Sequence, residues 1–91
     1  MESHLVEYKQ KWNDEFLKEL CAFANADSGT LFIGIKNDGE IRGISDAKVL
    51  LENLPNKINL TMGILPTIKL LEDKGKQYTQ IQVAKSERPV I

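Results

Sequence analysis

The sequence is poor in the residues that build covalent or metal-bound scaffolds. Its 91 residues include one cysteine, one histidine and three prolines. The single Cys21 excludes an internal disulfide framework and lies in an apolar helical pattern, so we expect a buried thiol. We expect His4 to be a surface residue rather than a member of a catalytic triad. The scarcity of cysteine fits a reducing compartment, and we expect a cytoplasmic protein.

Long hydrophobic runs and a strong charge of one sign are also missing. Apolar runs such as LFIGI fall far short of the about 20 residues that cross a bilayer, so we expect no membrane partner. Residues 1–45 carry five basic and eight acidic groups (-3), and residues 46–91 carry seven basic and five acidic groups (+2). Neither half is strongly basic, so any contact with nucleic acid has to come from local placement of charges.

What the sequence does contain predicts one small globular domain. Apolar residues make up 42% of the chain, which excludes disorder, and the length suits a single domain. Strand-like and helix-like patterns follow one another along the chain. We expect an α+β fold with a mixed, mostly antiparallel sheet and helices packed mainly on one face.

The first elements are a strand and a helix. Residues 5–9 alternate apolar and polar side chains, which predicts a short strand. Apolar residues recur at helical spacing after Asn13, a good N-cap, and predict a helix over residues 14–25. Turn-forming residues at 25–29 end this helix.

A glycine-containing hairpin follows. Residues 30–35 predict a buried strand, and Gly34 within it indicates a bulge or the close approach of another backbone. Asn-Asp-Gly at 37–39 predicts a turn, with a returning strand over 40–44. The glycines do not open a helix, so their spacing is not that of a dinucleotide or phosphate-binding loop.

The second half predicts helices and a second hairpin. Ser45 is a candidate cap for a helix over 46–53, with Val49, Leu50 and Leu54 facing inward, and Pro55 ends it. A further short helix is expected over 55–62. The rest predicts strands over 64–72 and 77–84, joined by the turn DKGK, and a polar turn with the start of another strand over 85–91.

Basic and aromatic side chains surround two of the predicted loops. If strand 5–9 pairs beside the first hairpin, these side chains share one face, contact phosphates, and offer a tryptophan for stacking. Solvated lysines and a buried tryptophan are the alternative. The candidate nucleic-acid-binding residues are Lys9, Lys11, Trp12, Asn25, Lys36, Asn37 and Arg42.

Carboxylates also flank these elements. Glu2 and Glu7 border the first strand, and Asp38 and Glu40 lie in the hairpin. Carboxylates from neighbouring strands can hold Mg²⁺ or Mn²⁺, which prefer oxygen ligands. Solvated surface acids are the alternative.

Three stretches carry a family resemblance. Residues 2–9, ESHLVEYK, are similar to the pattern Glu-Ser-x-x-x-Glu-Phe-Lys. Residues 23–44 resemble a core in which a helix ending in Ala-Asn precedes a small-residue turn, an apolar strand, an acidic turn with glycine, and a strand ending in glycine. ILP and IQVAKSERPV match later parts of the pattern. Over nearly its whole length the chain resembles the Schlafen-type AlbA-like domain of bacterial transcriptional regulators.

The resemblance implies a module that binds nucleic acid, with DNA the expected partner, without catalysis or cofactor. We expect residues 1–91 to be a single domain excised from a longer regulator, whose C-terminal regions would be further partners. A protein-interaction module that forms a homodimer is an alternative, because an unpaired sheet edge can join two copies.

The resemblance also raises a nuclease alternative. Related domains in animal Schlafen proteins cleave RNA with a metal and three acidic residues. Glu2 and Glu7 match two of these acids, and Asp38 is the only acid near the third, because Lys36 and Asn37 stand where acids are usual. Glu2, Glu7 and Asp38 with Mg²⁺ or Mn²⁺ form this alternative site, which the positive charge of Lys36 disfavours.

Overall fold

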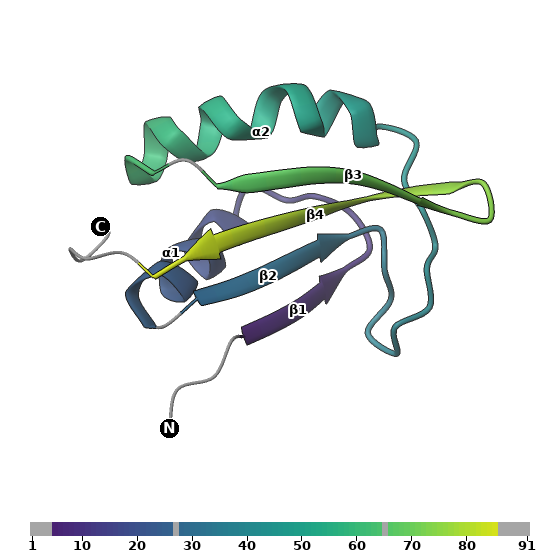
Figure 1. Ribbon diagram of the computed structural model, residues 1–91, viewed down its shortest axis with the longest axis horizontal. Helices are drawn as coiled ribbons and strands as arrows, with labels where there is room; N and C mark the ends of the chain where they lie inside the picture. Colours follow the sequence, from purple (N-terminus) through teal and green to yellow (C-terminus); the bar gives the residue numbers. More distant parts are fainter. Residues whose placement is uncertain (1–4, 27, 65, 86–91) are drawn as a thin grey trace.

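The computed structural model describes residues 5–26, 28–64 and 66–85. Glu2, His4, Asp27 and residues 86–91 of the turn and strand start expected over 85–91 therefore lie outside the described residues. No helix in the described ranges has the length and apolar content needed to span a membrane. The elements, in chain order, are β1 (Leu5–Lys9), α1 (Phe16–Ala26), β2 (Ser28–Ile33), α2 (Ala47–Met62), β3 (Thr67–Asp73) and β4 (Lys76–Ala84) (Figure 1).

The four strands form one mixed sheet in the order β1-β2-β4-β3. β1 runs parallel to β2, because α1 connects them and returns the chain to the same end of the sheet. The pairs β2–β4 and β3–β4 are antiparallel. The expected α+β class with a mostly antiparallel sheet is confirmed.

Both helices cover one face of this sheet. The register pairs Leu31 of β2 with Ile81 of β4, so these buried side chains point the same way. They join a core to which both helices contribute; in Figure 1 α1 lies behind the sheet. Gly29 lies directly under the ring of Phe23, because a Cβ atom built there would fall 2.3 Å from the ring. The core consists of Leu20, Phe23, Ala24, Leu31, Ile33, Leu50, Leu54, Ile58, Met62, Ile81 and Val83.

The start of the first helix differs slightly from the expectation. The Asn13 side chain accepts a hydrogen bond from the Glu15 N–H (2.9 Å), as a cap does. Three successive backbone bonds between residues three apart then form tight turns, beginning with the Phe16 N–H to the Asn13 carbonyl (2.9 Å). The regular helix begins only at Phe16.

The predicted returning strand over 40–44 is wrong. Ile35 and Ile41 form a single isolated bridge, after which the chain leaves the hairpin. The N–H groups of Arg42 and Gly43 both donate to the Gly34 carbonyl, at 2.8 and 2.9 Å, so no ladder continues. Gly43 has a φ of +78° and packs against Lys76, which directs the chain across the start of β4 instead.

The predicted break at Pro55 is also wrong, because α2 is one continuous helix with Pro55 inside it. Proline removes one helical hydrogen bond, but buried side chains line the core-facing stripe on both sides of it. Leu50 and Leu54 face inward as expected, whereas Val49 is 53% exposed. Asp46, rather than Ser45, occupies the N-cap position.

The second hairpin is confirmed. β3 and β4 are joined by Lys74 and Gly75, whose φ angles of 51° and 80° are those of a tight two-residue turn. Its register leaves the start of β4 beside the loop that follows β2, which positions the site described next.

Candidate nucleic-acid interface

The ends of β1 and β2 bring two loops together. Because the strands are parallel, both finish at the same edge of the sheet. The Lys9 carbonyl accepts hydrogen bonds from the N–H groups of Gly34 (2.7 Å) and Ile35 (3.1 Å). We call this region the strand-end surface. It holds six of the seven predicted binding residues, namely Lys9, Lys11, Trp12, Lys36, Asn37 and Arg42.

Lys9 is held within the fold. Its side chain lies on the helix-covered face and forms an ion pair with Glu19 of α1 (3.3 Å). Its ammonium group also lies 4.8 Å from the centre of the Phe16 ring. A phosphate would have to compete with both contacts, so Lys9 contributes less to an anion site than a solvated lysine.

Trp12 and Asp14 form a second small network beside it. The Trp12 indole N–H donates to Asp14 (2.7 Å), and the half-buried ring meets Phe16 edge-on. The Lys57 ammonium of α2 pairs with Asp14 (3.0 Å). Hydrogen bonds from Lys57 and then Trp12 hold the pKa of Asp14 below its ordinary value. Trp12 is therefore oriented by the fold rather than freely rotating.

Residues 36–40 form the tip of the loop after β2, and the charged side chains there interact with one another. Lys36 pairs with Glu40 (3.3 Å), and the Asp38 carboxylate accepts a hydrogen bond from the Glu40 N–H (2.9 Å). Asn37 lies exposed at the tip. Arg42 is exposed and forms no ion pair within residues 5–26, 28–64 and 66–85. Lys11 is likewise exposed, with no ion pair in those ranges.

Asn25 does not join this group. It lies in the last turn of α1, at the end of the sheet where β2 begins. Its side-chain amide donates to the Cys21 sulfur (3.7 Å). A ligand at the strand-end surface would have to run the length of β2 to reach it.

Two acidic residues of the alternative site, Glu7 and Asp38, lie on different elements. Glu7 lies in the middle of β1, and Asp38 lies at the hairpin tip, where its carboxylate already caps the turn. Within the part of the chain that the structure describes, no three acidic, histidine or cysteine side chains are grouped to hold a metal. Glu2 lies outside that part.

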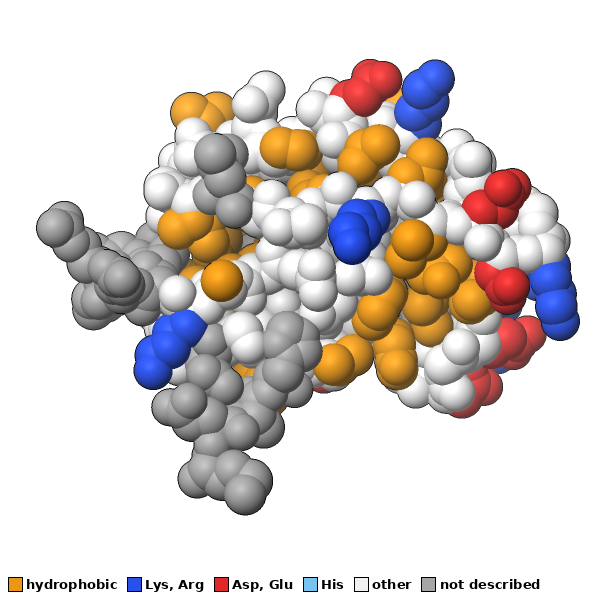
Figure 2. All heavy atoms as spheres, in the orientation of Figure 1, with side chains coloured by type: hydrophobic (Ala, Val, Ile, Leu, Met, Phe, Trp, Pro, Cys, Tyr) orange, Lys and Arg blue, Asp and Glu red, His pale blue; other side chains and the backbone are white. Residues whose placement is uncertain are grey.

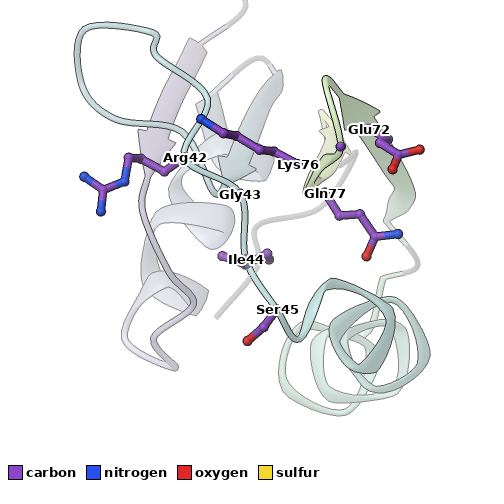
Figure 3. Close-up of a pocket in the computed structure, with 8 residues that line it drawn as sticks. Arg42, Gly43, Ile44, Ser45, Glu72, Lys76 and Gln77 are labelled. Carbon is purple, nitrogen blue, oxygen red and sulfur yellow. The ribbon is translucent and has the colours of Figure 1, made fainter.

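A pocket of about 490 Å³ lies between the loop after β2 and the β3–β4 hairpin. Gly43, Ile44 and Gln77 lie along it, and Figure 3 shows the Arg42 guanidinium directed away from Glu72 and Gln77. Lys76 donates to the Ile41 carbonyl (3.5 Å). Lys76 of the hairpin therefore reaches across to the loop, while Arg42 faces outward from the pocket.

Comparison with known proteins identifies the family. The family model described as Schlafen, AlbA_2 matches residues 2–91. The chain belongs to the Schlafen AlbA_2 family. No curated protein matches it in sequence.

Solved structures show the same fold for this Schlafen AlbA_2 domain. The chain is similar to the DIP2311 protein from Corynebacterium diphtheriae, with a TM-score of 0.76 and 20% sequence identity. The match covers 93% of this chain and 18% of that protein, so the domain corresponds to a small part of the larger chain. At this identity the likeness concerns the fold alone.

The sheet face opposite the two helices of the Schlafen AlbA_2 domain carries aromatic residues that the sequence analysis did not select. Tyr8, Phe32 and Tyr78 are neighbours across β1, β2 and β4, with ring centres 5.6 and 6.3 Å apart. Figure 2 shows a hydrophobic patch on this face. The alternation of side chains along a strand could have predicted this position. Phe32 lies between the buried Leu31 and Ile33 and therefore faces away from the core.

Proposed function

We propose that this domain binds nucleic acid, with DNA the expected partner, as a non-catalytic module of a bacterial transcriptional regulator. The observation that carries the proposal is the placement of Arg42, whose exposed guanidinium lies on a loop at the same end of the sheet as the segment that carries the exposed Lys11. A guanidinium matches the geometry of phosphate oxygens and stays charged at every physiological pH.

The backbone supports Arg42 in that position. Its N–H and that of Gly43 both donate to the Gly34 carbonyl, and Gly34 in turn donates to the Lys9 carbonyl. The loop is thus tied to the end of β1, so less conformational freedom is lost when a phosphate binds. Lys36 and Lys9 supply further positive charge, but each has a carboxylate partner to give up.

The net charge of the whole chain limits the affinity that we expect for nucleic acid. A formal net charge of -1 provides no long-range attraction to a polyanion, so affinity comes from a few local contacts. We expect weak binding by this domain alone, with a strong dependence on salt.

Fluorescence anisotropy with a labelled duplex tests the proposal. We expect binding at low salt, with each phosphate contact contributing about -0.9 to the slope of log K against log salt. Arg42→Ala combined with Lys11→Ala should weaken binding and flatten that slope. Lys18→Ala, which removes an exposed charge from α1, is the matched control and should change little. Absence of binding to duplex and single strands at low salt, or an unaltered double variant, would contradict the proposal.

A further inference from the structure

We propose that the face of the sheet opposite the two helices is a stacking platform for the unpaired bases of single-stranded nucleic acid. The platform consists of Tyr8, Phe32 and Tyr78. This inference rests on the proposed function and specifies which form of nucleic acid the domain prefers.

The register places the three rings in one row. Tyr8 pairs with Phe32 across the parallel β1–β2 ladder, and their ring planes are inclined by 35°. Phe32 and Tyr78 are diagonal neighbours across β2 and β4, with ring planes inclined by 46°. All three side chains are half-buried, so each ring is held by its neighbours and still reaches solvent. Rings fixed in this way need little further ordering to accept a base.

The surroundings of the rings suit a nucleotide better than an apolar protein surface. Phe32 pairs with Gln80, and Gln80 pairs with Lys69 of β3, so an amide and an ammonium group lie next to the aromatic row. Figure 2 shows a basic side chain beside the hydrophobic patch. Amides can bond base edges, and lysines can neutralise phosphates. Aromatic rings on the helix-free face of a four-stranded sheet are a known way to hold two or three unstacked bases.

The platform is joined physically to the strand-end surface. A Cβ atom built on Gly34 would lie 2.9 Å from the Cβ of Tyr78, so the two residues are in direct contact. The Gly34 carbonyl also accepts the Arg42 N–H (2.8 Å). A single strand crossing from Tyr8 to Tyr78 therefore ends beside the loop that presents Arg42. A duplex keeps its bases stacked inside and cannot use the rings.

An oligothymidylate and an abasic strand with the same number of phosphates separate stacking from charge attraction. We expect anisotropy to show tighter binding of the oligothymidylate, and Phe32→Leu or Tyr78→Leu to remove roughly five- to a hundredfold of its affinity. These leucine variants keep an apolar side chain, and thermal melting confirms that they fold. Val6→Ala is the matched control, because it removes an exposed aliphatic side chain from the same face of β1.

Tyrosine fluorescence gives an independent readout. Tyr8 and Tyr78 are the only tyrosines in the chain, and both belong to the platform. Stacked bases should quench their emission, and the abasic strand should not.

The outcomes distinguish this inference from the proposed function. Equal affinity for the abasic strand and the oligothymidylate, or tighter binding of duplex, would refute the platform and leave the proposed function standing. Failure of every nucleic acid to bind would refute both. A concentration-dependent dimer whose dissociation follows Phe32→Leu would assign the face to a second copy and refute the platform.

Discussion

Gly34 packs against the side chain of Tyr78, where a Cβ atom on the glycine would lie 2.9 Å from the tyrosine Cβ. The backbone at Gly34 has a φ of +108°, which residues other than glycine rarely adopt. Space and backbone conformation thus both require glycine at the point where β2 leaves the sheet. The contact connects the loop of Arg42 to the aromatic face.

We expect Gly34→Ala to destabilise the fold by about 2–4 kcal/mol, since steric overlap adds to backbone strain. Gly39→Ala is the matched control, because Gly39 has a φ of +92° but nothing within 4 Å of an added Cβ. It should lose only about 1 kcal/mol from strain. Urea unfolding measures both variants, and equal losses would show that the Tyr78 contact is unimportant.

Arg42→Lys tests whether the guanidinium fork matters beyond its charge. The variant keeps one positive charge, so the salt dependence of duplex binding should be unchanged. Affinity should fall severalfold, because an ammonium group cannot make the paired hydrogen bonds of a guanidinium. Anisotropy titrations across salt concentrations measure both quantities. Unchanged affinity would indicate that Arg42 acts only as a point charge.

Asp14 should make stability depend on pH in the acidic range. Its pKa lies below the ordinary value of 3.8, chiefly because Lys57 and Trp12 donate hydrogen bonds to the carboxylate. The ionised Asp14 carboxylate therefore stabilises the folded state fully at pH values above its ordinary pKa. This contribution is lost as the pH falls through the lower pKa of the folded state. Because Asp14 is exposed, the effect should be small.

Asp14→Asn provides the measurement. The amide keeps an acceptor for the Trp12 indole but removes the charge that pairs with Lys57. The wild-type protein should melt at a higher temperature than the variant at neutral pH, and the difference should vanish at strongly acidic pH. A difference that persists there would mean that the ion pair is not its source.

Pro55→Ala should stabilise the protein by roughly 1–3 kcal/mol, because alanine restores the hydrogen bond that proline removes from the middle of α2. Asn56→Ala, at the exposed next position, controls for helix propensity and should gain only about 0.5 kcal/mol. Thermal unfolding compares the two. A loss of stability in Pro55→Ala would indicate that the proline ring packs usefully against its neighbours.

Local patterns were sufficient for most of the secondary structure. The alternation at residues 5–9 predicted β1, and the close approach at Gly34 was anticipated from a glycine within an apolar strand. The errors came where distant contacts outweigh local preference. Pro55 is retained inside α2 because Leu54 and Ile58 are buried against the core on either side of it. The expected strand at 40–44 was lost to hydrogen bonds with Gly34 and Gln77.

The candidate site was also predictable from the sequence only in part. The sequence identified most residues of the strand-end surface, because loops rich in lysine and arginine are visible without coordinates. Pairing of Lys9 with Glu19, and of Lys36 with Glu40, determines how available those charges are. Such pairings depend on the packing of elements or on the conformation of a turn.

By itself the sequence determined the family, the α+β class and the residue types on each strand, since these follow from local periodicity and motif spacing. Only the tertiary structure decided which residues meet. Strand order and register placed Tyr8, Phe32 and Tyr78 in one row and put Asn25 at the far end of β2. Register is a long-range property, because each pairing joins residues that are far apart in the chain.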